Sequence, residues 1–430
     1  MKHLYTFILL TTLLFPLHAQ LNGDGFYRVQ NVKTKRYISV IDSKGSINVS
    51  STQADLGAIQ TIKGFDRAAI DPSTVIYIEK VGEEYDLIAQ GTSVYGIVGI
   101  TVEIRNEGGF YQAYKSHSGI SRYLYDLDII DFNEGFVTTT GYYKDGFQNW
   151  YIKPITEQDQ YYLAVNPTIY KDGHYYQTYY SSYGFNFNNQ EDKAYYISQI
   201  DNNVAVYNEL LGTVPASTPV IICGKSNVVS EHKITPLRNT PAAVTDNKLT
   251  GTYFCSSVSG HINRIINDAT IRMLGILSDG SLGFKKDASL SYVPHNTAYL
   301  KVAATAPDEI QLMSEEEYNR WKAPVTLTAV NITREYGEDN PELTYTIDGK
   351  LLGGTPVLSC EATATSPAGT YPITIAKGDV ENAFTELVNG TLTITPAPLT
   401  VKVGSYTRKY GEDNPVFEVT YEGWKNGDDI

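Results

Sequence analysis

The chain of 430 residues is poor in cysteine, tryptophan, methionine and positive charge. Its three cysteines are too few for a disulfide framework and show no metal-ligand spacing. With 34 Lys and Arg against 48 Asp and Glu, the formal net charge is −14. Binding to nucleic acid or anionic lipid needs a basic face, so this balance argues against both as partners.

The sequence also lacks the short patterns of common enzyme chemistry. It contains no Gly-x-x-x-x-Gly-Lys-Ser/Thr, His-Glu-x-x-His or Gly-x-Ser-x-Gly pattern. Cys223 and Cys255 lie in apolar runs, which favour buried structural thiols over nucleophiles. We therefore expect no catalytic residue, no metal site and no cofactor. The alternative is a secreted hydrolase with catalytic carboxylates in the N-terminal region, since spacing along strands does not show which carboxylates face one another across a cleft.

The N-terminus has the layout of a cleaved secretory signal peptide over residues 1–19. Met1-Lys2-His3 supplies the positive start, an uncharged apolar run covers 4–17, and Ala19 precedes the expected cut. The run is shorter than the ~20 residues that a membrane-spanning helix needs, and no later segment is long and apolar enough to span. The sequence predicts a secreted or cell-surface protein without a transmembrane segment.

An internal repeat marks the C-terminal part. Arg-Glu-Tyr-Gly-Glu-Asp-Asn-Pro at 334–341 recurs as Arg-Lys-Tyr-Gly-Glu-Asp-Asn-Pro at 408–415. Alternating apolar residues and turn signals between them predict a small immunoglobulin-like sandwich over 323–396 and part of a second one over 397–430. The Glu338-Asp339-Asn340 cluster reads as a turn before Pro341, with a Ca²⁺ loop as the alternative.

These repeats resemble the MBG family of bacterial surface repeats, of the Tyr-Gly type. The matching residues are Tyr336 to Pro341, Ser366 to Ile373 and Asn389 to Ile394. Such modules stand in tandem on secreted or surface proteins of Bacteroidetes-type bacteria. The resemblance therefore implies a stalk or adhesive array, with further repeats expected after residue 430.

The middle region, 161–322, is expected to be a β-rich sandwich module. Its strand-length runs are punctuated by Pro, Gly and Asn. The order of Ala194-Tyr195-Tyr196, Val214 to Val220 and Pro294 to Leu300 is similar to a β-rich module of secreted Bacteroides and Prevotella proteins. Ser314 opens a capping box for a short helix, and Ala323-Pro324 marks the boundary to the first repeat.

The N-terminal region, 20–160, contains aromatic-marked pairs of strands. These pairs look similar to the hairpins of ricin-type β-trefoil lectins, and Gln148-Asn149-Trp150 matches that family's Gln-x-Trp motif once. The family has the motif in each lobe, so the single copy leaves a generic Greek-key barrel as the alternative. The resemblance makes Gln148 and Trp150 candidate ligand-binding residues.

Tyrosine is the most unusual feature of the composition, with 34 Tyr and 14 Phe against three Trp. Aromatic residues favour strands, so the whole chain is expected to be all-β. In the stretch Tyr175 to Phe187, odd positions would share one face of a strand and even positions the other. If the odd face is the core, Tyr176 and Tyr180 form an exposed platform for a sugar or peptide.

Together these features predict an exported, non-catalytic binding or adhesion protein. A β-rich head over 20–322 would present an extracellular glycan or protein ligand on a stalk of repeats. Tyrosine suits such partners because it offers a large contact area with few rotors and a hydroxyl. Packing between pleated sheets is the alternative role for any single tyrosine.

Overall fold

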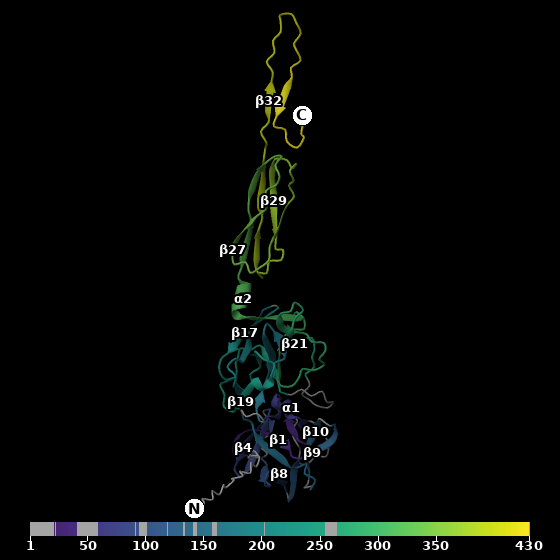
Figure 1. Ribbon diagram of the computed structural model, residues 1–430, viewed down its shortest axis with the longest axis vertical. Helices are drawn as coiled ribbons and strands as arrows, with labels where there is room; N and C mark the ends of the chain where they lie inside the picture. Colours follow the sequence, from purple (N-terminus) through teal and green to yellow (C-terminus); the bar gives the residue numbers. More distant parts are fainter. Residues whose placement is uncertain are drawn as a thin grey trace, which may run out of the picture. The chain divides into compact units, whose positions relative to one another are not determined.

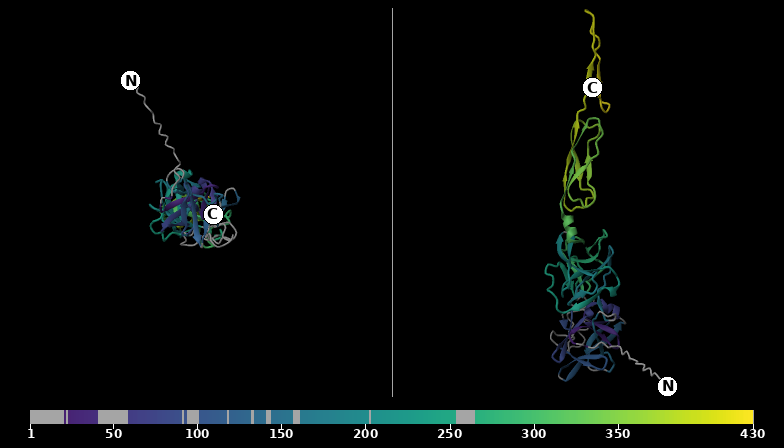
Figure 2. Two further views of the ribbon diagram at one scale, coloured as in Figure 1. Left: turned by 90° about the horizontal axis from the view of Figure 1, so that it is seen from below. Right: turned by 60° about the vertical axis from the view of Figure 1, so that its left-hand side comes forward.

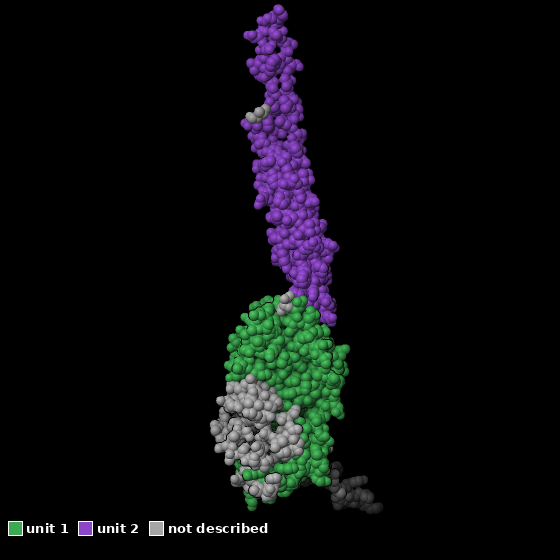
Figure 3. Space-filling view, turned by 180° about the vertical axis from the view of Figure 1, so that it is seen from behind, with its two compact units in different colours: residues 1–314 green, residues 315–430 purple. Residues whose placement is uncertain are grey.

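The computed structural model shows an all-β chain, as the sequence predicts (Figure 1). It describes residues 21, 23–40, 59–90, 92–93, 101–117, 119–131, 134–140, 144–156, 161–201, 203–253 and 265–429. The predicted signal peptide lies outside the described residues, as does Cys255. The chain divides into two compact units, Met1–Ser314 and Glu315–Ile430 (Figure 3). Among the described residues, no helix is long and apolar enough to cross a membrane.

The N-terminal part of the first unit is a sheet that curls until strands β1 and β11 pair with one another. The order β11-β8-β9-β10-β3-β2-β1 closes because β1 also pairs with β11, while β4, β5 and β6 continue from β1 and β7 pairs with β8. A closed curl is common to both predicted barrel architectures. The strands are β1 (Gly25–Asn31), β2 (Arg36–Val40), β3 (Ile59–Lys63), β4 (Ile76–Val81), β5 (Glu84–Ala89), β6 (Thr92–Ser93), β7 (Glu103–Asn106), β8 (Tyr111–His117), β9 (Ile120–Asp131), β10 (Glu134–Thr140) and β11 (Trp150–Pro154).

The two faces of β1 pack against different neighbours. Alternation along the strand sends Tyr27 and Val29 into an apolar core that also contains Ile38, Ile76 and Trp150. Arg28 lies between them and is also buried, on the opposite face. There it meets the short helix α1 (Phe65–Ala69), whose carbonyls accept its hydrogen bonds. Strand β1 therefore links the core to the surface on which the rest of the first unit packs.

The middle region forms one long curled sheet and a three-stranded one. The long sheet runs β13-β14-β18-β16-β17-β24-β22-β21-β23-β20, and the small one β12-β19-β15. Their strands are β12 (Leu163–Ala164), β13 (Ile169–Lys171), β14 (His174–Tyr179), β15 (Gly184–Phe187), β16 (Lys193–Asp201), β17 (Val204–Leu210), β18 (Val220–Gly224), β19 (Lys233–Leu237), β20 (Leu249–Thr252), β21 (Ile271–Ile276), β22 (Leu282–Lys285), β23 (Thr297–Lys301) and β24 (Glu309–Ser314).

Curling brings together strands that are distant in the order of the long sheet. The hydroxyls of Thr178 on β14 and Thr297 on β23 share a hydrogen bond of 2.7 Å. Just beyond β14, the amide of Tyr180 donates to the carbonyl of Asn296 at 3.2 Å. The loop that precedes β23 is thereby fixed beside β14.

The second unit begins with helix α2 (Glu315–Lys322) and continues as a two-sheet sandwich. One sheet has the order β27-β25-β30 and the other β26-β31-β29-β28. Leu327, Ile373 and Leu392 are fully buried between the sheets, as expected of alternating strands. The strands are β25 (Val325–Ala329), β26 (Ile332–Glu335), β27 (Tyr345–Gly349), β28 (Val357–Cys360), β29 (Gly369–Ala376), β30 (Thr385–Val388) and β31 (Gly390–Thr395).

The residues that follow the first repeat form a hairpin of β32 (Thr400–Val403) and β33 (Val419–Glu422) at one end of the sandwich (Figure 2). Val401 and Val403 are 54% and 64% exposed. Their counterparts in the first repeat, Leu327 and Ala329, are buried. The hairpin therefore presents to solvent the residues that the first repeat places in its core.

Candidate functional site

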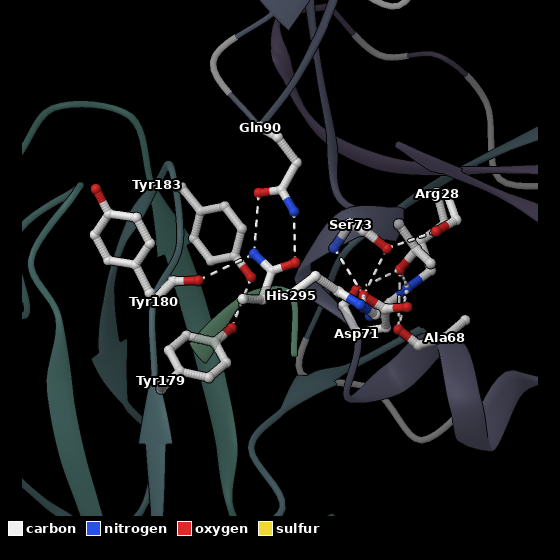
Figure 4. Close-up of polar contacts among 12 residues, drawn as sticks. Arg28, Ala68, Asp71, Ser73, Gln90, Tyr179, Tyr180, Tyr183 and His295 are labelled. Atoms are coloured by element: carbon white, nitrogen blue, oxygen red, sulfur yellow. Dashed lines mark hydrogen bonds and ion pairs between the residues drawn. The ribbon is translucent and has the colours of Figure 1, made fainter. Parts of the chain in front are cut away.

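A cleft of about 360 Å³ opens in the first unit where the N-terminal sheet meets the middle region. Three segments line it: the chain that follows α1, strand β14 and the loop before β23. The polar side chains along its walls include Asp71, Gln177, Thr178, His295 and Asn296. Figure 4 shows Asp71 and His295 facing one another from two different parts of the chain.

Asp71 is held in place by the short 3₁₀ helix that it begins. The helix η1 covers Pro72–Thr74, and the Asp71 carboxylate accepts hydrogen bonds from the Ser73 amide at 2.9 Å and the Ser73 hydroxyl at 2.6 Å. Asp at the N-cap with Pro at the first helical position is a favoured helix start. The orientation of the Asp71 carboxylate is thus set by residues next to it in the sequence.

His295 reaches this carboxylate from the loop before β23. Its Nε2 lies 3.5 Å from Asp71 Oδ1, and the His295 side chain is 38% exposed against 17% for that of Asp71. Burial alone would lower the pKa of His295, but the hydrogen bond and charge of Asp71 raise it overall. Burial would likewise raise the pKa of Asp71, yet His295 and Ser73 together lower it. The cleft therefore contains an ion pair at mildly acidic pH.

A second polar contact, between the side chains of Gln90 and Asn296, lies near the Asp71–His295 pair. The Gln90 side-chain amide donates to Asn296 Oδ1 at 2.6 Å, and Asn296 Nδ2 donates to Gln90 Oε1 at 3.1 Å. Asn296 Nδ2 also reaches the carbonyl of Tyr180 at 3.0 Å. These bonds join the end of β5 to the loop that presents His295.

The buried guanidinium of Arg28 connects α1 to the start of the middle region. Arg28 donates to the carbonyls of Ala68 at 3.2 Å and Tyr162 at 2.8 Å. Its guanidinium also lies over the ring of Phe65, 5.6 Å from the centroid. Burial lowers the pKa of Arg28 to about 10, partly offset by nearby groups, so it stays cationic at neutral pH. Asp71 is one of the groups that raise the pKa of Arg28 against this effect of burial.

Gln148 and Trp150, predicted from the trefoil resemblance, lie inside the N-terminal sheet. Trp150 is 1% exposed and donates its indole N–H to the Leu124 carbonyl at 3.0 Å. Gln148 is 2% exposed. The large ring fills the closed curl, where its transfer out of water stabilises the fold. The structure gives both residues a place in the interior, and a ligand role for them stays a prediction.

Tyr176 and Tyr180, predicted as an exposed pair, are both half-buried. Tyr176 lies on β14 against the apolar core of the long sheet, and burial, followed by its contact with Cys223, raises the pKa of its hydroxyl. Tyr180 follows the end of β14 and stacks on Tyr253 with ring centroids 4.3 Å apart. The strand pattern correctly predicts buried Tyr179, but curling of the sheet covers the even face as well.

Sequence reasoning missed the residues that the fold gathers in the cleft. Asp71 occurs in Asp-Pro-Ser-Thr, a local helix-start pattern, and His295-Asn296 occurs in the Pro-x-Asn-x-Ala-Tyr-Leu stretch. Each of these two segments can be recognised from the sequence by itself, but neither indicates a site. Their meeting depends on the long-range packing of the N-terminal part against the loop before β23, which no local spacing encodes.

Comparison with known proteins identifies part of the second unit. Residues 325–393 match a family model described as an MBG domain of the YGX type. This confirms the MBG assignment that the Tyr-Gly motifs predict. The match runs from the start of β25 into β31 and so spans most of the sandwich. No curated protein matches the chain significantly.

Proposed function

We propose that this protein is an exported surface or adhesion protein that binds a glycan in the cleft of its first unit. The MBG domain supports a surface or adhesion-type role, because it is a repeat-type module without catalytic function. In this proposal the repeats act as a spacer, and the predicted signal peptide over 1–19 directs export.

The cleft is the observation that carries the proposal. A volume of about 360 Å³ lies within the range of small-ligand sites and suits one or two sugar rings better than a folded protein partner. Its amide, hydroxyl, carboxylate and imidazole groups can hydrogen-bond sugar hydroxyls. Pro294, which is exposed, adds apolar surface for a ring face.

The same cleft favours binding over hydrolysis. Glycosidases of the common types need two carboxyl groups across the scissile bond, roughly 5 to 9.5 Å apart. Among the described residues that line the cleft, Asp71 is the single carboxylate. It is engaged by Ser73 and His295, and no serine hydroxyl is positioned by His295 among the described contacts.

A glycan array probed with residues 20–430 tests the proposal. Binding should weaken at least tenfold in Asp71→Asn and Gln177→Ala, since both remove groups from the cleft wall. Asp172→Asn is the matched control, because Asp172 has a side chain 78% exposed and lies outside the cleft lining. Equal effects of the two Asp→Asn changes would place the glycan elsewhere, and turnover of an array glycan would support the hydrolase instead.

A further inference from the structure

The Tyr-Gly turn that marks the MBG repeats has a contact beyond its own repeat. Tyr336 and Gly337 directly follow β26, and the turn is closed locally by a hydrogen bond from the Glu338 amide to the Glu335 carbonyl at 3.2 Å. Gly337 has φ +86°, a backbone conformation that favours glycine. The backbone conformation of the turn thus explains Gly337, but the turn itself does not bind the hydroxyl of Tyr336.

That hydroxyl binds the chain that follows the second-repeat hairpin. Tyr336 Oη donates to Asp428 Oδ2 at 2.7 Å. Beside it, Lys425 Nζ lies 3.6 Å from Glu335 Oε1. Asn426 Nδ2 donates to the carbonyl of Ala364 at 3.2 Å. Figure 1 shows the chain after β33 returning toward the end of the sandwich where these contacts form.

The glycine also belongs to this contact surface. A Cβ on Gly337 would lie 2.6 Å from Cβ of Lys425. The equivalent Gly411 of the second repeat has nearly the same φ, +88°, but nothing lies within 4 Å of its Cβ position. Absence of a side chain at 337 therefore lets the next repeat approach the turn.

The two repeats differ at the residues that make these contacts. In register, Lys425, Asn426 and Asp428 correspond to Leu351, Leu352 and Gly354 of the first repeat. The first repeat, which follows helix α2 instead of another repeat, lacks the polar side chains. Conversely, Tyr410 is fully exposed at the position equivalent to half-buried Tyr336.

We infer that the Tyr-Gly turn is a docking surface for the following MBG repeat. Its partner is the turn Lys425–Asp428, which supplies a cation, an amide and a carboxylate to Glu335, Ala364 and Tyr336. Because three contacts converge on one turn, they fix the hairpin's orientation relative to the first sandwich. The motif by which the family is recognised then serves assembly of the array.

Hydrogen exchange on the full chain, with millisecond labelling, tests this inference. Tyr336→Phe should lower the protection of amides in 419–428 about threefold or more, the size of one net hydrogen bond. Asp428→Asn should have a similar effect, and the double variant should add little to either. Tyr410→Phe is the matched control and should change nothing, because Tyr410 has the same motif position without a docked repeat.

Protection of β29 reports whether the first sandwich stays folded in each variant. Gly337→Ala provides a second test beside Gly411→Ala, since both carry the same backbone strain but only the first meets Lys425. A larger loss of 419–428 protection in Gly337→Ala supports docking. Equal effects of Tyr336→Phe and Tyr410→Phe, or additive effects of Tyr336→Phe and Asp428→Asn, would overturn it.

Discussion

The side chains of Gln90 and Asn296 exchange two hydrogen bonds although 206 residues separate them in the chain. Both residues also have positive φ, 53° and 51°. Asparagine adopts this region at modest cost, but glutamine does so rarely. The buried amide pair therefore stabilises two unfavourable backbone conformations and, through them, the loop that presents His295.

Replacing one member of this pair should destabilise the first unit. Asn296→Ala leaves the buried Gln90 amide without its partner and should cost about 1–3 kcal/mol. Denaturant unfolding followed by Trp150 fluorescence, in a Trp321→Phe/Trp424→Phe background, measures the change. The double variant Gln90→Ala/Asn296→Ala should cost less than the sum of the single changes. Strict additivity would show that the two amides do not act together.

The Asp71–His295 pair should give the first unit a window of added stability in mild acid. The raised pKa of His295 adds stability that is complete below about 6.5, its ordinary value, and is lost as pH rises through the raised value. The lowered pKa of Asp71 adds stability present above 3.8 and lost as pH falls through the lowered value. Added stability from the pair should thus be greatest between about 4 and 6.5.

His295→Gln should remove the His295 part of this window. Thermal unfolding between pH 4 and 9 should show a larger loss at pH 5.5 than at pH 8.5 in this variant. His174→Gln is the control, since His174 lies outside the cleft lining. An equal loss at both pH values would contradict an ion pair at this site.

A second histidine should matter more for folding than for binding. The side chains of His232 and Asp192 are 1% and 0% exposed, with Nδ1 and Oδ1 2.8 Å apart, and Nε2 faces the Ser226 carbonyl at 2.7 Å. Two acceptors require a doubly protonated ring. Burial opposes this, but Asp192 and Ser226 raise the pKa of His232 overall.

His232→Ala should therefore cost about 3 kcal/mol or more, because it leaves the buried Asp192 carboxyl group without its hydrogen-bonded partner. Chemical denaturation near pH 6 measures this, with His174→Ala, at a half-buried histidine, as the control. The stabilising contribution of His232 should fall as pH rises through its raised pKa. A cost below that of His174→Ala would show that the pair contributes nothing to the fold.

The extent of sequence prediction differs between the two units. In the second, Tyr336-Gly337 and the alternating strands are local patterns, so repeat, fold and family could all be predicted. In the first, Gln148-Asn149-Trp150 could be recognised as a local motif, but the burial of Trp150 depends on how the whole sheet curls. The cleft could not be predicted, because Asp71 follows α1 and His295 precedes β23, and the two meet only when the N-terminal part packs against the middle region.

The equivalent strands of the two repeats should differ in amide exchange. Leu327 on β25 is buried between two sheets, while Val401 on β32 faces solvent from a two-stranded hairpin. Isolated hairpins are marginal in water. Amides of 400–403 should therefore exchange at least about tenfold faster than those of 325–329. Equal protection in a hydrogen-exchange experiment would mean that another surface covers the hairpin.

Pairing of β1 with β11 sets an order of events during synthesis. The first strand to emerge from the ribosome cannot complete its ladder until Trp150–Pro154 has followed it. The hydrogen bonds of Arg28 are completed later still, since one of its carbonyl acceptors, that of Tyr162, lies 134 residues further along the chain. A nascent chain that stops near residue 150 thus has an unpaired edge on β1 and an Arg28 guanidinium that lacks its acceptor at Tyr162. Arrest peptides placed along the gene should register folding force only after both segments have left the exit tunnel.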